Sequence, residues 1–141
     1  MTTTATTPVP ARTDRLPVWK HGLAASVGAS IATTAIAAVA SAAGVTFAGP
    51  DGSSIPLLGF AQLTMLFSLI GVGIAAVLAR RARRPRSTFV RTCVALLVLS
   101  FVPDLTFGFD GASAAVLILT HVAAATIVVP TLARRLVRDN R

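Results

Sequence analysis

Long apolar runs alternate with short polar connections along this chain. Four runs are free of charge over most of their length and cover residues 22–47, 57–79, 88–109 and 112–133. A helix needs about 20 residues to cross a hydrocarbon layer of about 30 Å. The pattern therefore predicts an all-α fold, a four-helix transmembrane bundle, formed by a membrane domain at residues 19–136.

Composition supports the same class of protein. Hydrophobic residues make up 54% of the 141 residues and charged residues 13%. Such a chain has too few charges for a soluble surface and too many apolar residues for one small core. Residues 1–18, rich in Thr, Pro and Ala, are expected to form a disordered cytoplasmic tail, and residues 137–141 a basic C-terminal end.

Basic residues are confined to three parts of the sequence. They are Arg12, Arg15 and Lys20; Arg80, Arg81, Arg83, Arg84, Arg86 and Arg91; and Arg134, Arg135, Arg138 and Arg141. If four helices alternate in direction, all three clusters lie on one side of the membrane. By the positive-inside rule, both termini are then cytoplasmic, in a multi-pass protein of the bacterial cytoplasmic (inner) membrane.

The net charge of +8 predicts a lipid partner. The Arg80 to Arg86 connection is expected to lie against anionic headgroups. Nucleic-acid binding is not expected, because the basic residues do not share a folded face with interleaved aromatic residues. Four thin helices enclose little space, so a homo-oligomer is a further expectation.

The first run has two readings. A basic start followed by an apolar stretch and Ala40-Ser41-Ala42 fits a cleaved signal peptide. Secretory apolar regions span about 7–15 residues, however, and this run stays uncharged from 22 to 47, which favours a retained helix.

Small and weakly polar residues form stripes on the first two predicted helices. The stripes comprise Ser26, Ser30, Thr33, Thr34, Ala37 and Ser41, and then Thr64, Ser68, Gly71 and Ala75. Such stripes let helices approach closely and hydrogen-bond, so both should face protein, while Leu66, Leu69 and Ile70 should face lipid. Gln62 falls on the face away from Thr64, where it is either interfacial or in contact with another protomer.

The third run contains the only acid placed inside an apolar segment. Pro103 should kink the helix and free the Leu99 carbonyl, and Asp104 follows it directly. By helix rise, Asp104 should lie about 7 to 8 Å from the helix end at Phe109. An ionisable group at that depth costs about 2 to 3 kcal/mol, so it normally faces the bundle interior and takes a partner.

His121 in the fourth run is the expected partner. A short connection at 110–111 makes the last two helices a hairpin, which brings His121 within side-chain reach of Asp104. The pair either locks the hairpin without chemistry or handles a proton for a bound molecule, and the second reading is favoured. Asp104 and His121 are thus the candidate catalytic pair. The candidate ligand-binding residues around them are Ser100, Phe101, Phe107 and Thr120.

Cofactor and metal chemistry is not expected from these residues. Asp104 and His121 supply two ligands, whereas a closed zinc site needs four. Cys93 is the single cysteine, so no disulfide can form within the chain.

The overall pattern resembles a family of small four-span integral membrane proteins of actinobacteria without an assigned function. The resemblance rests on the Ala-rich first span, the Arg-rich central connection, residues 102–108 (VPDLTFG) and His121 followed by residues 129–131 (VPT). It covers nearly the whole chain and implies architecture alone.

The residues thus predict a membrane protein that binds or moves a small lipophilic or protonatable molecule at an Asp104 and His121 site. Two alternatives remain open. One is a membrane-embedded acid–base enzyme, such as an isomerase, cyclase or hydrolase of a lipophilic substrate. The other is an accessory subunit without chemistry.

Overall fold

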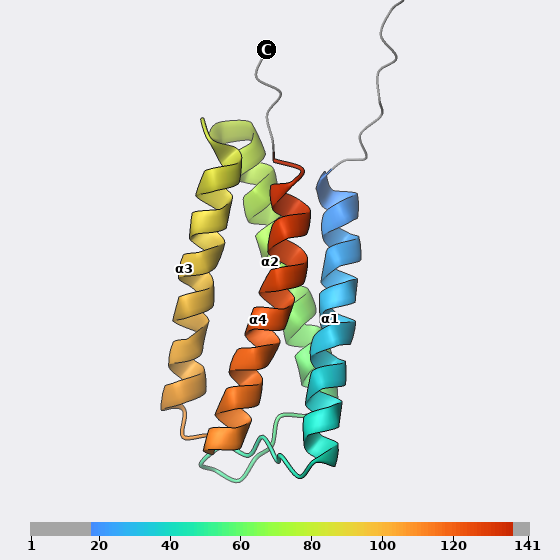
Figure 1. Cartoon of the computed structure of the whole chain (residues 1–141), viewed down its shortest axis with the longest axis vertical. Helices are drawn as coiled ribbons and strands as arrows, with labels where there is room; N and C mark the ends of the chain where they lie inside the picture. Colours follow the sequence, from blue (N-terminus) through green and yellow to red (C-terminus); the bar gives the residue numbers. More distant parts are fainter. Residues whose placement is uncertain (1–17, 137–141) are drawn as a thin grey trace, which may run out of the picture.

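The computed structural model describes residues 18–136, which form four helices running up and down side by side (Figure 1). They are α1 (Val18–Ala42), α2 (Leu57–Arg81), α3 (Pro85–Thr106) and α4 (Gly111–Ala133). Each is long and apolar enough to cross a membrane. The predicted all-α four-helix bundle is confirmed, and the chain is a multi-pass membrane protein. The two predicted tails lie outside the described residues, apart from Val18, which is the first residue of α1.

Two helices end earlier than the apolar runs predicted. α1 ends at Ala42 and not at residue 47, because Gly44 adopts a left-handed φ of +94°. The N–H of Gly44 bonds to the carbonyl of Ser41 and that of Val45 to the carbonyl of Ala40, which is the Schellman stop. α3 ends at Thr106, two residues before Gly108, whose φ is +82°. Hydropathy alone cannot register these glycine stops.

The small-residue stripes face protein, as predicted. On α1 the buried members are Ser26, Ser30, Thr33 and Ala37, and on α2 they are Ser68 and Ala75. Leu66, Leu69 and Ile70 are exposed on the bundle surface, so they point out of the bundle as expected. Ser41 is the exception on α1, because it lies in the last turn and is exposed.

The α1–α2 contact is close enough to exclude a side chain at Gly22. A Cβ at this position would overlap the Val72 side chain. Across the same contact the hydroxyls of Thr33 and Thr64 are hydrogen-bonded at 2.9 Å. Most other stripe hydroxyls bond within their own helix, as Ser30 does to the Ser26 carbonyl. The stripe therefore works mainly by permitting close packing.

The loop between α1 and α2 closes one end of the bundle (Figure 1). Phe47 is buried there at a φ of +51°, a region that bulky residues rarely adopt. Its ring packs edge-on against Phe60 with centroids 5.0 Å apart, and its N–H donates to the Ser113 hydroxyl at 3.2 Å. Ser113 in turn donates to Asp110 at 2.6 Å, so the loop is tied to the start of α4.

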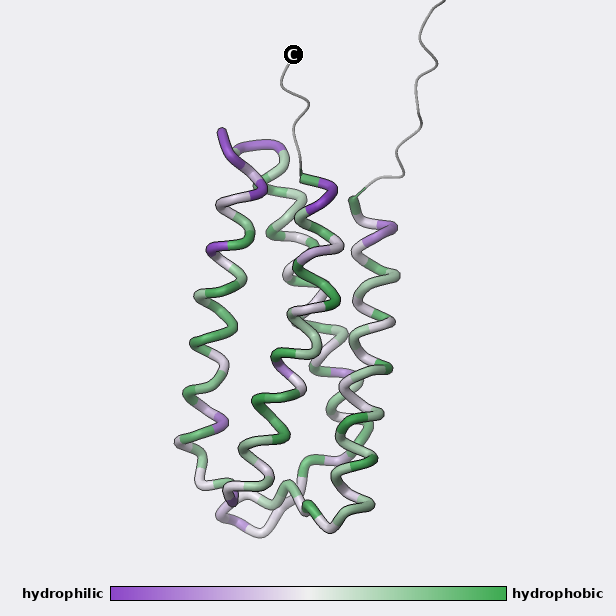
Figure 2. Tube along the Cα trace, viewed as in Figure 1, coloured by the Kyte–Doolittle hydropathy of each residue, from purple (hydrophilic) through white to green (hydrophobic). Residues whose placement is uncertain are grey.

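The opposite end of the bundle carries the polar, basic connections. Figure 2 shows hydrophilic residues gathered where α2 meets α3 and where α4 finishes. Arg80 and Arg81 close α2, and Arg134 follows α4. Because the helices alternate in direction, basic residues that are far apart in the sequence lie at the same end of the bundle.

Candidate functional site

Asp104 is the inward-facing residue of an otherwise loosely packed helix. α3 buries just Pro85, Phe89 and Asp104, while large apolar residues such as Leu99 and Leu105 are exposed. This arrangement inverts the pattern of a soluble helix, since the acid is inside and the apolar side chains are outside. It fits a helix surrounded by lipid whose one acid turns toward the bundle.

The position of Asp104 along α3 differs from the prediction. The helix continues through Pro103, and the Phe107 N–H bonds to the Pro103 carbonyl. Because α3 stops at Thr106, Asp104 lies about 3 Å of helix rise from its end, and the predicted depth was wrong. Its burial therefore comes from packing against the bundle and not from depth along the helix.

His121 on α4 meets Asp104, as the hairpin argument predicted. Nδ1 of His121 lies 3.0 Å from Oδ2 of Asp104. The Asp104 side chain is only 8% exposed, whereas the His121 side chain is 40% exposed. The carboxylate is thus enclosed, and the imidazole is the open member of the pair.

A second contact places a hydrogen on Nδ1 of the imidazole. Nδ1 of His121 also lies 2.9 Å from the backbone carbonyl oxygen of Leu117, one turn back on α4. A backbone carbonyl oxygen can only accept, which places a hydrogen on Nδ1; in the neutral imidazole the lone pair is then on Nε2. This carbonyl was missed from the sequence, although the spacing of four residues from His121 could have suggested it.

The ring N–H is directed at Leu117 and not at the carboxylate. Oδ2 of Asp104 is buried, and without this N–H it accepts no hydrogen bond from any group within residues 18–136. It remains in electrostatic contact with His121 at 3.0 Å. A buried carboxylate oxygen without an aligned donor is costly, so this atom is the unsatisfied point of the site.

The other candidate residues contribute unequally. Thr120 is buried and donates its hydroxyl to the Leu117 carbonyl at 2.7 Å, while the half-buried Ser100 donates to the Leu97 carbonyl at 2.7 Å. Both hydroxyl protons are therefore used within their own helices. Phe101 is half-buried, but Phe107 is 63% exposed and its ring does not enclose the pair.

The pair is an ion-pair contact between one carboxylate and one imidazole. In the part of the chain that the structure describes, no three His, Cys, Asp or Glu side chains come together. Asp104 and His121 offer one acceptor oxygen that needs a donor and one ring nitrogen with a lone pair. Together they can bind a cationic donor or exchange a proton.

Comparison with known proteins gives a family and no closer relative. No curated protein matches the chain, and no solved structure matches it. Residues 13–138 match the family model described as a family of unknown function, DUF6069. This match spans all four helices and the connections between them, so the chain belongs to the DUF6069 family.

Proposed function

We propose that this protein binds or moves a small lipophilic, protonatable molecule at the Asp104–His121 pair. The observation that carries the proposal is the buried Oδ2 of Asp104, which has the Nδ1 atom at 3.0 Å but no aligned hydrogen-bond donor. A protonated amine that reached Oδ2 past the half-exposed His121 ring would supply both the missing donor and the opposite charge. The exposed apolar residues of α3 offer a surface for its lipophilic body.

The open imidazole gives the site a way to release such a molecule. With the hydrogen on Nδ1, Nε2 of His121 can accept the proton that a cationic ligand brings. The ligand would then lose its charge and its attraction to Asp104. Binding and movement would thus be coupled to proton transfer between the ligand and His121.

The geometry also supports catalysis as a second candidate function. In this structure the Leu117 carbonyl holds Nδ1–H, which leaves Nε2 of the neutral ring free to act as a general base beside the Asp104 carboxylate. Such a pair could serve an isomerase, cyclase or hydrolase acting on a lipophilic substrate. An accessory subunit would need neither group to exchange a proton.

Thermal unfolding in lipid nanodiscs tests the binding proposal. The wild type should be stabilised by lipophilic amines and much less by their uncharged carbon isosteres, and Asp104→Asn should abolish the difference. Asp51→Asn is the matched control, because it removes an exposed acid from the α1–α2 loop. Equal stabilisation by amines and isosteres, or an unchanged response in Asp104→Asn, would rule out this site.

Transport and catalysis differ in their need for a gradient. In proteoliposomes, transport of an amine found in that screen should depend on a proton gradient and fail in Asp104→Asn. Catalysis should persist in detergent without a gradient and fail in both Asp104→Asn and His121→Ala. If Asp104→Asn and His121→Ala both fold and leave the function of the protein in the cell unchanged, the accessory role is favoured.

The proposal includes an orientation in the bacterial cytoplasmic membrane, in keeping with the actinobacterial family that the sequence resembles. The basic end, with the Arg80 to Arg86 connection against anionic headgroups, would face the cytoplasm. In a Cys93→Ser background, a membrane-impermeant maleimide applied to intact cells should label Ser53→Cys in the α1–α2 loop. It should not label Ser87→Cys at the start of α3, and the reverse result would invert the orientation.

A further inference from the structure

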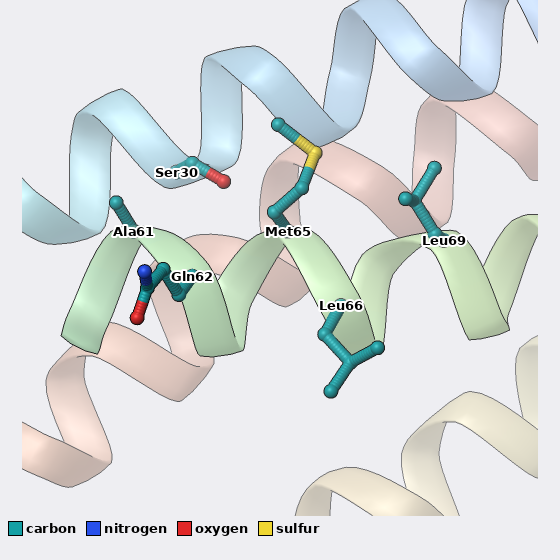
Figure 3. Close-up of a pocket in the computed structure, with 6 residues that line it drawn as sticks. All are labelled: Ser30, Ala61, Gln62, Met65, Leu66 and Leu69. Atoms are coloured by element: carbon teal, nitrogen blue, oxygen red, sulfur yellow. The ribbon is translucent and has the colours of Figure 1, made fainter. Parts of the chain in front are cut away.

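A groove between α1 and α2 lies on helices other than those that carry the Asp104–His121 pair. Its volume is about 440 Å³, and it is lined by Ser30, Ala61, Gln62, Met65, Leu66 and Leu69 (Figure 3). Met65 reaches toward α1, whereas Gln62 and Leu66 point away from it. The groove therefore presents an apolar face of α2 that carries one carboxamide.

Gln62 is the polar residue of this face that points away from α1. It is exposed on α2, five residues after Leu57, which is about 7.5 Å along the helix. The other polar residue of the groove cannot donate to it, since the Ser30 hydroxyl bonds to the Ser26 carbonyl at 2.9 Å. A carboxamide in hydrocarbon is satisfied best by another polar group from a neighbouring helix.

Two exposed leucines share a face of α2 with Gln62. Leu66 and Leu69 lie four and seven residues further on, and both are exposed. With Gln62 they form one face of α2, following the spacing of residues that meet a partner helix. The opposite face of α2, with Ser68 and Ala75, is already buried within the bundle.

From these observations we propose that α2 pairs with α2 of a second copy of this chain through Gln62, Leu66 and Leu69. Copies inserted with the same orientation are related by a twofold axis along the membrane normal. Each Gln62 then lies at the same depth as its counterpart. A carboxamide is both donor and acceptor, so two Gln62 side chains can satisfy each other, while the leucines pack beside them.

Cysteine cross-linking in membranes tests the contact directly. In a Cys93→Ser background, Gln62→Cys and Leu66→Cys should give disulfide-linked dimers on mild oxidation. Val94→Cys is the matched control, because Val94 is equally apolar and exposed but lies on α3. Cross-linking at Val94 and not on α2, or at none of the three, would overturn the proposal.

Energy transfer between labelled copies, measured as lipid is added, tests the role of the carboxamide. Gln62→Leu should raise the dissociation constant of the dimer about threefold or more, and Gln62→Asn should stay closer to the wild type. An exposed Leu is compatible with folding in lipid, so loss of structure does not confuse the result. A monomeric wild type, or a dimer indifferent to Gln62→Leu, would refute the pairing.

Discussion

Nδ1 of His121 lies 3.0 Å from Oδ2 of Asp104, and this contact joins the most loosely packed helix of the bundle to α4. The enclosed partner is the acid and the open partner is the base. Two interpretations of the pair, a lock between α3 and α4 and a site that exchanges a proton, both depend on this difference in exposure. Measurements of stability and of ligand binding can separate them.

Loss of the imidazole should destabilise the bundle more than loss of both partners. His121→Ala leaves a buried carboxylate without its neighbour and should lower the free energy of unfolding by roughly 2 kcal/mol. The double variant Asp104→Leu/His121→Ala buries no charge and should recover part of that loss. Reversible unfolding in mixed detergent micelles measures both values.

A double variant less stable than His121→Ala would contradict this expectation. It would mean that the Asp104 side chain stabilises α3 through contacts other than the one to His121. Asp51→Asn, an exposed substitution in the α1–α2 loop, gives the background effect of removing an acid.

The close approach of α1 and α2 should make Gly22 intolerant of a methyl group. Gly22→Ala places a Cβ in overlap with Cγ2 of Val72 and should cost about 1 to 3 kcal/mol of stability. Val72→Ala in the same chain should relieve the overlap. Gly28→Ala on the same helix is the control, because a Cβ there has no neighbour within 4 Å and helix propensity favours alanine.

The hydrogen bond between the Thr33 and Thr64 hydroxyls should contribute a small coupling free energy to the stability of the bundle. A double-mutant cycle with Thr33→Val and Thr64→Val removes the 2.9 Å hydrogen bond while keeping side-chain size. Interhelical hydrogen bonds in membranes contribute about 0.6 kcal/mol on average, so the coupling should be near that value. Additive single effects would show that the hydroxyls are satisfied equally well without each other.

Acid should weaken the bundle through the cap of α4. The hydrogen bond from the Ser113 hydroxyl, followed by those from the Ser113 and Ala112 N–H groups, lowers the pKa of Asp110 below its ordinary value. The ionised form is therefore favoured in the folded state. The stability that it contributes is present above the ordinary aspartate value of about 4 and is lost as the pH falls through the lowered pKa.

Unfolding measured from pH 7 downward checks this sign. Asp110→Asn keeps a good N-cap residue but cannot titrate, so it should flatten the acid-side loss of stability. The comparison is made in an Asp51→Asn background, because the hydrogen bond from Ser53 lowers the pKa of Asp51 in the same direction. An acid-side loss that persists unchanged in Asp110→Asn would assign it to another group.

Much of the fold followed from hydropathy and residue size. The four helices, the inward stripes on α1 and α2 and the outward-facing leucines of α2 could be predicted because each depends on local sequence. The ends of α1 and α3 could not, since they are set by the left-handed backbone conformations of Gly44 and Gly108. The contact of Asp104 with His121 was predictable from the hairpin, but its geometry was not.

The sequence by itself determined that this chain crosses a membrane as four helices, because the length and apolarity of a segment decide that without reference to its neighbours. It also determined that one acid and one imidazole would be available inside the bundle. Only the tertiary structure decided that Nδ1 of His121 is directed at the Leu117 carbonyl, which leaves Oδ2 of Asp104 without a donor. The reason is physical: a hydrogen bond is directional, so the relative placement of α3 and α4 and the rotamer of one ring select which acceptor is satisfied.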